Sequence, residues 1–306
     1  MNVVSFYRFL DISEPEVLRD ELQALCDTQD LLGTILIATE GFNATIAGRR
    51  GAITAVLDWL KARFKVAETF DARWTSAEEP PFRRMRVRVK REIVTLGRPD
   101  ILPHKMTGQH VPPEQWNALI EDPDVLVVDT RNHYEYEVGT FPGAIDPGND
   151  SFREFPGFAK LLAETSSHRP LAMFCTGGIR CEKASALMLE LGFREVYQLQ
   201  GGILNYLETV PAGENQWDGE CFVFDTRVAV DRDLSEGGYV QCHACRRPLS
   251  TADLESPDYR EGVSCPRCVN EGDEDRRARL EERRRQILLA KERGEAHIGA
   301  QTGTKI

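Results

Sequence analysis

Apolar positions in the N-terminal part of the chain alternate between two periodicities. Runs with strand-like composition occupy residues 3–9, 34–38 and 43–47, with a Glu40-Gly41 turn between the last two. A capping-box pattern with a helix-compatible proline stands at 13–16. Apolar residues then recur at helical spacing, at Leu18, Leu22, Leu25 and Cys26, and later at Ile53, Val56, Leu57, Leu60 and Phe64. An extended run over 85–96 closes a βαββαβ order, which predicts a ferredoxin-like domain at residues 1–96.

The last run of this domain is unusually basic. In a strand, alternate residues share one face, and this run would place on one face Arg84, Arg86, Arg88 and Lys90. The opposite face would carry Met85, Val87 and Val89. Such a row of cations is typical of an edge strand that resists aggregation, or of a surface that binds a polyanion. We favour polyanion binding, and the edge-strand interpretation stays open.

A second pattern follows a segment that is rich in proline. Residues 97–116 lack periodicity and predict a surface linker, where His104 and His110 are interpreted as surface residues. Residues 117–212 predict an α/β domain with a parallel sheet, with apolar strands at 125–128, 171–174 and 196–199. Open sheets of this kind hold ligands at the carboxyl ends of their strands.

The loop after the 171–174 strand contains the main candidate for chemistry, Cys175. A tight loop of Thr176, Gly177, Gly178 and Ile179 leads to a helix that is expected to open near Arg180. This order directs backbone N–H groups, and the positive end of a helix, at the sulfur, while Arg180 adds a charge at the rim. The pKa of the thiol should therefore fall from about 8.5 to roughly 5–7. Cys175 is predicted to be an activated nucleophile.

A second cysteine, Cys181, follows six residues after Cys175. The two side chains can approach each other across the loop and one helical turn, which would allow a transient disulfide as a resolving step. Alternatively, Cys181 is only packed inside the first turn of the helix. The sequence leaves both roles open.

The C-terminal part carries a metal-binding pattern. Two C-x2-C pairs, nineteen residues apart, contain Cys242, Cys245, Cys265 and Cys268. Four thiolates select Zn²⁺ in a closed tetrahedral site, which is structural and not catalytic. We expect a strand over 220–230, a zinc-binding segment over 213–272, and a charged helix with a disordered tail over 273–306.

Composition narrows the class of protein. The chain has 306 residues and a net charge of −11, which by itself argues against nucleic acid, although the charge is distributed unevenly. No run of 18 apolar residues and no secretory signal is visible, so no membrane partner is expected. Eight dispersed cysteines indicate reduced thiols and a metal site, as in the cytoplasm. Neither a nucleotide-cofactor motif nor an iron motif of two histidines and a carboxylate is visible.

Residues 125–208 resemble a rhodanese domain. The matching features are the Asp129-x-Arg131-x3-Glu135 stretch, the Gly139-Thr140-Phe141-Pro142-Gly143-Ala144 turn, the Cys175 loop and the closing Gly201-Gly202-Ile203. The resemblance implies that Cys175 is a nucleophile able to hold a persulfide, braced by Asp129, Arg131 and Glu135. Related phosphatases need five residues between cysteine and arginine, whereas this loop has four, which suits a smaller occupant.

Over about residues 3–290 the chain resembles the rhodanese-like, oxygen-dependent tRNA uridine(34) hydroxylases, including Glu40-Gly41-Phe42-Asn43-Ala44-Thr45-Ile46. The resemblance implies a cytoplasmic enzyme that hydroxylates C5 of the wobble uridine of tRNA with O₂. A thiolate can add to C6 of a pyrimidine and make C5 electron-rich enough to meet an oxidant, whose identity stays open. Two alternatives remain, a rhodanese-type sulfurtransferase with a cysteine persulfide and a non-enzymatic RNA-binding scaffold. A sulfurtransferase would leave the cationic strand and the zinc segment unexplained. An RNA-binding scaffold would leave the activated cysteine unexplained.

Overall fold

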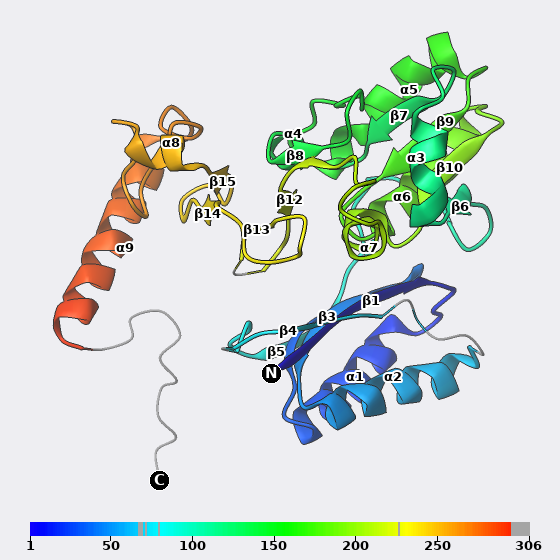
Figure 1. Ribbon diagram of the computed structural model, residues 1–306. Helices are drawn as coiled ribbons and strands as arrows, with labels where there is room; N and C mark the ends of the chain where they lie inside the picture. The colour runs from blue at the N-terminus through cyan, green and yellow to red at the C-terminus, as the bar shows by residue number, and fades with distance from the viewer. Residues whose placement is uncertain (67–69, 71, 79, 226, 295–306) are drawn as a thin grey trace. The chain divides into compact units, whose positions relative to one another are not determined.

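The computed structural model describes residues 1–66, 70, 72–78, 80–225 and 227–294. Internal contacts divide the chain into two units, Met1–Gly219 and Glu220–Ile306 (Figure 1). Within the described residues, no helix is both long and apolar enough to span a membrane. The tail that the sequence predicts to be disordered follows Gly294 and lies outside the described residues.

A five-stranded sheet forms the N-terminal part of the first unit. In chain order its elements are β1 (Asn2–Phe9), α1 (Pro15–Thr28), β2 (Leu32–Ala38), β3 (Gly41–Gly48), α2 (Arg50–Phe64), β4 (Arg73–Ser76) and β5 (Met85–Val89). The strand order is β4-β1-β3-β2-β5, and all neighbours are antiparallel except β2 and β5. The first four strands have the ferredoxin-like arrangement that the sequence predicted.

Two details of this domain correct the sequence prediction. The strand that closes the ferredoxin-like order is β4, which is short and lacks buried residues, so no apolar pattern reveals it. The basic run forms an added fifth strand, β5, and the strand ends at Val89 instead of continuing to residue 96. The helix α1 starts without the expected capping box: Glu14 is its N-cap, makes no side-chain cap hydrogen bond, and is followed by Pro15, which is preorganised for the first helical position.

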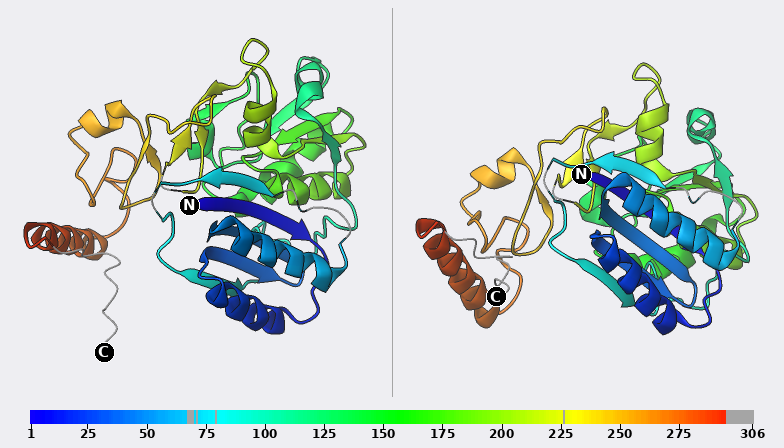
Figure 2. Two further views of the ribbon diagram at one scale, coloured as in Figure 1. Left: turned by 60° about the horizontal axis from the view of Figure 1, so that its bottom comes forward. Right: turned by 90° about the horizontal axis from the view of Figure 1, so that it is seen from below.

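The helices α1 and α2 cover one face of this sheet (Figure 2). They bury Leu18, Leu22, Cys26, Ile53, Val56 and Leu60 against Val4, Phe6, Ile35, Ile37 and Phe42 of the strands. Because side chains alternate along a strand, Tyr7 and its cross-strand partner Asn43 point to the opposite face.

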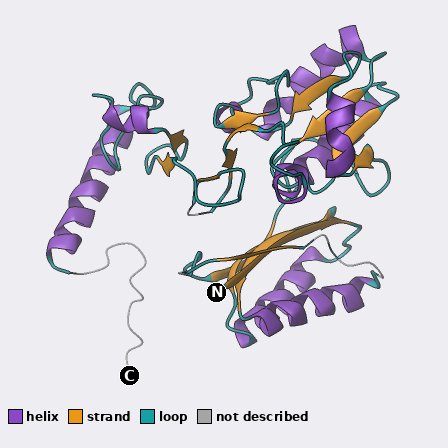
Figure 3. Ribbon diagram, in the orientation of Figure 1, coloured by secondary structure: helices purple, strands orange, loops and turns teal. Residues whose placement is uncertain are grey.

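The second part of the first unit is a four-stranded parallel sheet, as predicted. Its elements are β6 (Gln109–Val111), α3 (Pro113–Ile120), β7 (Leu126–Asp129), α4 (His133–Tyr136), β8 (Gly139–Thr140), a 3-10 turn (Phe152–Glu154), α5 (Phe155–Ser166), β9 (Leu171–Phe174), α6 (Ile179–Glu190), β10 (Val196–Leu199) and α7 (Gly202–Thr209). The sheet order is β6-β10-β9-β7. Figure 3 shows its strands in orange and the surrounding helices in purple. A two-residue strand, β11 (Asp218–Gly219), pairs with β8.

The two faces of this sheet are separate cores. On one face, Met173 of β9 packs in an apolar cluster with residues of α5 and α6. On the other face, the neighbouring Phe174 makes edge contacts with the rings of Trp116 and Phe141. This alternation places the residue after β9, Cys175, at the edge where helices from both faces meet the end of the sheet.

The segment interpreted as a linker over 97–116 is partly ordered structure of this sheet. The strand β6 pairs with β10, and α3 begins at Pro113. A strand of three residues is too short to show a periodicity, and only its long-range pairing identifies it.

The second unit contains short elements and one long helix. They are β12 (Cys221–Phe222), β13 (Ala229–Val230), β14 (Val240–Gln241), β15 (Pro248–Leu249), α8 (Thr251–Glu255) and α9 (Glu274–Glu292). The single strand expected over 220–230 is a hairpin of β12 and β13. The Asp225 carboxylate accepts the backbone N–H of Arg227, and Val228 has a φ of 64°, so the chain turns within this run. Thr226 lies outside the described residues.

Candidate active site at the Cys175 loop

Cys175 directly follows β9, and its loop ends at the first turn of α6. Gly178 is the N-cap of α6 with a φ of 96°, and its N–H donates to Cys175 Sγ over 3.1 Å. The backbone N–H groups of Arg180 and Cys181 also lower the pKa of this thiol. Cys175 is only 1% exposed. The arrangement is the ring of amide donors that the order of strand, glycine loop and helix predicted.

The environment of the Cys175 sulfur favours its ionised form. Burial alone raises the pKa of a thiol, because the charged form loses its hydration. Here the Cys181 thiol, the Arg180 charge and the backbone N–H groups outweigh burial and lower the pKa of Cys175 to about 6. At neutral pH the thiol is then mostly ionised.

Cys181 lies on the inner side of the first turn of α6. Burial raises the pKa of its thiol well above the usual range, and the neighbouring Cys175 raises it further. Cys181 therefore stays protonated beside an ionised Cys175, and its thiol lowers the pKa of Cys175. The hydroxyl of Thr130 lies 3.5 Å from the Cys181 sulfur.

Arg180 does not stand at the rim of the loop as an isolated charge. It is buried, and its guanidinium makes two parallel hydrogen bonds to Glu135 of α4, of 2.6 and 2.7 Å. Burial raises the pKa of the Glu135 carboxyl, but the Arg180 charge outweighs it and lowers that pKa. The Thr176 hydroxyl donates to the same carboxylate over 3.5 Å. Glu135 thus connects α4 to both sides of the loop.

A second buried ion pair lies at the end of β7, the strand beside β9. Arg131 donates to Asp129 through Nε and Nη2, over 2.9 and 2.6 Å, and both side chains are fully buried. Between them, Thr130 donates through its N–H and its hydroxyl to the carbonyl of Phe174, both over 3.0 Å. The residue before Cys175 is therefore held by β7.

The start of α7 orients the carbonyl groups of the loop. The N–H groups of Ile203 and Leu204 donate to the carbonyl oxygens of Cys175 and Thr176, over 2.9 and 3.1 Å. This approach needs glycine at position 202, because a Cβ there would lie 2.5 Å from the carbonyl oxygen of Cys175. Because the carbonyl groups of Cys175 and Thr176 point to α7, the N–H groups of the loop can point to the sulfur.

The N-terminal domain also reaches this loop, which the sequence did not reveal. The Tyr7 hydroxyl lies 2.9 Å from the position of a Cβ on residue 178 and donates to Glu182 of α6 over 3.4 Å. His110, interpreted as a surface residue, is 44% exposed and lies 2.9 Å from the same carboxylate. His104 lies 3.2 Å from Asp11. These pairs are far apart in the sequence, so no local pattern identifies them.

Arg86 and Arg88 of the basic run lie on β5, at the edge of the N-terminal sheet, and Arg84 and Lys90 flank this strand. Val87 packs in the core with α1, so the alternation directs Arg86 and Arg88 to the opposite face. Arg88 is exposed, as are the flanking Arg84 and Lys90, and Arg86 is half-buried. This position fits both interpretations of the run, an edge protected by charge and a surface for a polyanion.

The four cysteines of the second unit form a cluster that could hold a metal ion. The sulfur atoms of Cys242, Cys245, Cys265 and Cys268 all lie within 4.8 Å of one another. Two of the separations are 3.8 Å and 3.5 Å, close to the ~3.8 Å between sulfurs that tetrahedral Zn–S bonds of about 2.3 Å require. The chemistry and the spacing of these donors therefore fit zinc.

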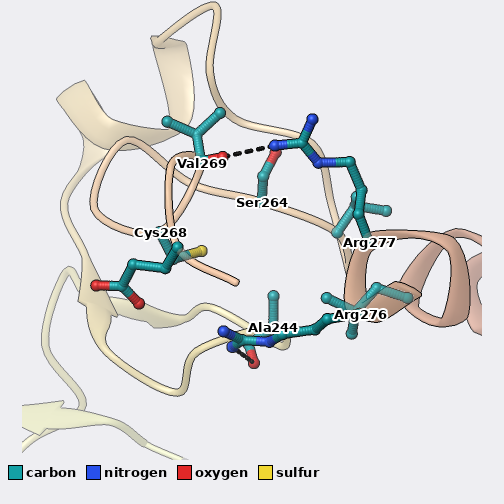
Figure 4. A pocket seen from close by; sticks show the side chains of 9 residues that line it. Ala244, Ser264, Cys268, Val269, Arg276 and Arg277 are labelled. Atoms are coloured by element: carbon teal, nitrogen blue, oxygen red, sulfur yellow. Dashed lines mark hydrogen bonds between the residues drawn. The ribbon is translucent and has the colours of Figure 1, made fainter. Parts of the chain in front are cut away.

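The helix α9 is attached to this cysteine cluster by its first turn. Arg276 and Arg277 donate to the carbonyl oxygens of Ala244 and Val269, over 3.4 and 2.7 Å, as Figure 4 shows. Ala244 and Val269 each adjoin a cysteine of the cluster. A metal ion that orders the two cysteine pairs would consequently order the start of α9.

Comparison with known proteins places both parts of the first unit in families. Residues 1–93 match the family model of the UPF0176 acylphosphatase-like domain, and residues 112–209 match that of the rhodanese-like domain. A tRNA uridine(34) hydroxylase from Teredinibacter turnerae is 48% identical over 297 residues, which are 97% of this chain and 92% of that protein.

Two similar solved structures each cover more than a third of the chain. A single-domain sulfurtransferase from Saccharomyces cerevisiae is 22% identical and covers 36% of this chain and 95% of its own, with a TM-score of 0.30. A protein from Bacillus halodurans is also 22% identical, over 38% of this chain and 80% of its own, with a TM-score of 0.30.

Replacement of Gly202 should disturb the loop specifically. Gly202→Ala places a methyl group against the Cys175 carbonyl, whereas Gly143→Ala, also at positive φ, meets nothing within 4 Å. Both variants should lose about 1–2 kcal/mol of unfolding free energy from the backbone conformation. Only Gly202→Ala should lose more and also slow alkylation of Cys175 by iodoacetamide, measured by peptide mass spectrometry. Equal behaviour of the two variants would show that α7 does not hold the loop.

Proposed function

This chain belongs to the tRNA uridine(34) hydroxylase family, and we propose that it hydroxylates C5 of the uridine at position 34 of tRNA in an oxygen-dependent reaction at Cys175. The family membership makes the chain an enzyme. The observation that supports Cys175 as its reacting group is the ring of N–H donors around a sulfur whose pKa is lowered to about 6. A thiolate at neutral pH is the form that attacks an electrophilic carbon.

The chemistry follows from the reactivity of a pyrimidine. The Cys175 thiolate adds to C6 of the uracil ring, which moves electron density to C5, where the oxidant reacts. The balanced reaction converts uridine, O₂ and water to 5-hydroxyuridine and hydrogen peroxide: replacing the C5 hydrogen by hydroxyl removes two electrons, reduction of one O₂ to hydrogen peroxide accepts them, and water supplies the hydroxyl oxygen. Elimination of Cys175 from C6 then restores the ring. The N–H groups and the Cys181 thiol that stabilise the thiolate also make it a good leaving group.

One observation favours a variant of this chemistry in which Cys175 carries sulfur. Cys175 is 1% exposed, so the loop as it stands accommodates a single sulfur atom more easily than a uracil ring. A Cys175 persulfide, formed when the thiolate takes the sulfane sulfur of a donor such as thiosulfate and releases sulfite, would then pass that sulfur to a nucleophilic acceptor, as in a rhodanese-type sulfurtransferase. Mass spectrometry of the enzyme distinguishes the two: an adduct with 5-fluorouridine tRNA supports addition to C6, and a persulfide alone supports the second.

The other parts of the chain receive supporting roles in this proposal. The N-terminal domain and its cationic strand bind the phosphates of tRNA, and the rhodanese part, predicted at 117–212 and extended here by β6 and α3, carries the reaction. The four cysteines hold Zn²⁺ as a structural ion. We place the enzyme in the cytoplasm, where tRNA and reduced thiols occur together.

Removal of the Cys175 sulfur should abolish hydroxylation. Cys175→Ala should leave no measurable 5-hydroxyuridine in tRNA from a deletion strain that carries the variant, because no neighbouring group replaces a thiolate. The variant should still fold, with an unfolding free energy lower by about 1–2 kcal/mol. Cys181→Ser is the matched variant: wild-type activity identifies Cys181 as a packing residue, and a loss equal to that of Cys175→Ala identifies a resolving thiol. Nucleoside mass spectrometry provides the measurement, and a folded, active Cys175→Ala enzyme would end the proposal.

Replacement of two exposed arginines, Arg88 of β5 and Arg84 just before it, should weaken tRNA binding in a salt-dependent way. Arg84→Ala with Arg88→Ala should reduce the slope of log affinity against log salt by about one to two units, across different tRNAs. Arg153→Ala with Arg194→Ala, which removes two exposed charges from the rhodanese part, is the control. An unchanged slope in the first variant would identify β5 as a charge-protected edge.

Removal of zinc should affect the second unit before it affects the chemistry. Because four thiolates leave no open position on the ion, a chelator should increase hydrogen exchange over residues 240–270 and the start of α9. The rate of Cys175 alkylation should not change. Metal analysis that finds no zinc in the purified protein, with all eight cysteines titrating freely, would refute this assignment.

A further inference from the structure

Lys183 of α6 is a buried charge that the reaction does not use. Its side chain is 0% exposed, and its ammonium donates to Glu40 over 2.7 Å and to Glu92 over 2.6 Å. The two carboxylates are 2% and 5% exposed. Lysine is almost never fully buried unless it is paired, because the desolvation of an ammonium is costly. The three residues are therefore one ionic cluster, here called the Lys183 cluster.

The carboxylates of the Lys183 cluster are held by the backbone of the N-terminal part. Glu40, in the turn between β2 and β3, accepts the N–H of Ile93 over 2.7 Å. Glu92 accepts the N–H groups of Leu96 and Gly97, over 3.1 and 3.0 Å. The cluster thus joins three segments that are far apart in the sequence: the β2–β3 turn, residues 92–97, and α6.

The third of these segments is the helix that holds the reacting sulfur. Lys183 lies one turn after Ile179, the first residue of α6. Next to the cluster, Ile179 packs against Phe9 and Ile93 in an apolar contact between the N-terminal domain and α6. The same first turn of α6 is also held by α4, because Arg180 donates a hydrogen bond to Glu135. The start of α6 is consequently fixed from two sides, one of which belongs to the N-terminal domain.

We infer that Lys183 is a positioning residue, which with Glu40 and Glu92 holds the start of α6 against the N-terminal domain and so keeps the backbone N–H groups of the loop on the Cys175 sulfur. The N-terminal domain is then part of the active centre in addition to any role in binding tRNA. The inference rests on the proposed role of Cys175 and adds a group outside the rhodanese domain to the activation of its thiol.

The test needs a variant that removes the clamp without leaving unpaired charges. Lys183→Met alone leaves two buried carboxylates facing each other, which destabilises the fold by itself. The triple variant Glu40→Gln, Lys183→Met, Glu92→Gln removes all three charges, and its carboxamide oxygens still accept the N–H groups of residues 93, 96 and 97. Lys160→Met, at an exposed lysine of α5, is the control for loss of one lysine.

Two measurements on the full-length protein separate positioning from stability. The first is the pH dependence of Cys175 alkylation by iodoacetamide, followed by peptide mass spectrometry, and the second is kcat and KM for tRNA hydroxylation. In the folded triple variant the alkylation midpoint should move from about 6 upward by about one unit, because N–H donors leave the sulfur. The kcat should fall about 10- to 100-fold with little change in KM.

The outcomes are distinct. A folded triple variant with the alkylation profile and kcat of the wild type would overturn the inference, since the cluster would then contribute only stability. A shifted alkylation profile in the triple variant, with a wild-type profile in Lys160→Met, supports it. Because alkylation needs no tRNA, this readout holds even if the enzyme proves not to hydroxylate uridine, so the two proposals fail independently.

Discussion

The contact of the α6 N-terminus with the Cys175 sulfur is the interaction on which the rest of the first unit depends. A thiolate in a buried site is unfavourable, and the Cys181 thiol, the Arg180 charge and the backbone N–H groups of the loop offset that cost. Backbone donors stay in place only if the helix start stays in place. Most of the buried polar groups of this unit serve that purpose, either by holding α6 or by fixing the end of β9.

The charges around the loop are balanced so that the thiolate is stabilised only moderately. A guanidinium without a partner beside the sulfur would lower the thiol pKa further, but Arg180 shares its charge with Glu135. Nucleophilicity falls as the pKa of a thiol falls, and the best attacking thiol has a pKa near the ambient pH. A value of about 6 keeps Cys175 mostly ionised at neutral pH without making it a poor nucleophile. The Glu135 pair therefore tunes reactivity as well as positioning Arg180.

The sequence predicted what depends on neighbours in the chain. The order of strand, glycine loop and helix around Cys175, and the spacing of the two cysteine pairs, are local patterns, and the structure contains both. The features that the sequence could not predict depend on pairing between residues that are far apart in the chain. The strands β4 and β6 are too short to show periodicity and exist through their partners. The contacts of Glu182 with His110, and of Lys183 with Glu40, join residues 72 and 143 positions apart.

The combination of domains brings the Cys175 loop together with groups from outside the rhodanese-like domain. The loop itself has four residues between Cys175 and Arg180. In this chain, two side chains of the N-terminal domain lie at the start of α6, with Tyr7 beside Gly178 and Glu40 on Lys183. The same domain carries the cationic strand. A domain that both binds the phosphates and braces the helix behind the thiol would couple the presence of tRNA to the geometry of Cys175, which a free-standing rhodanese domain cannot do.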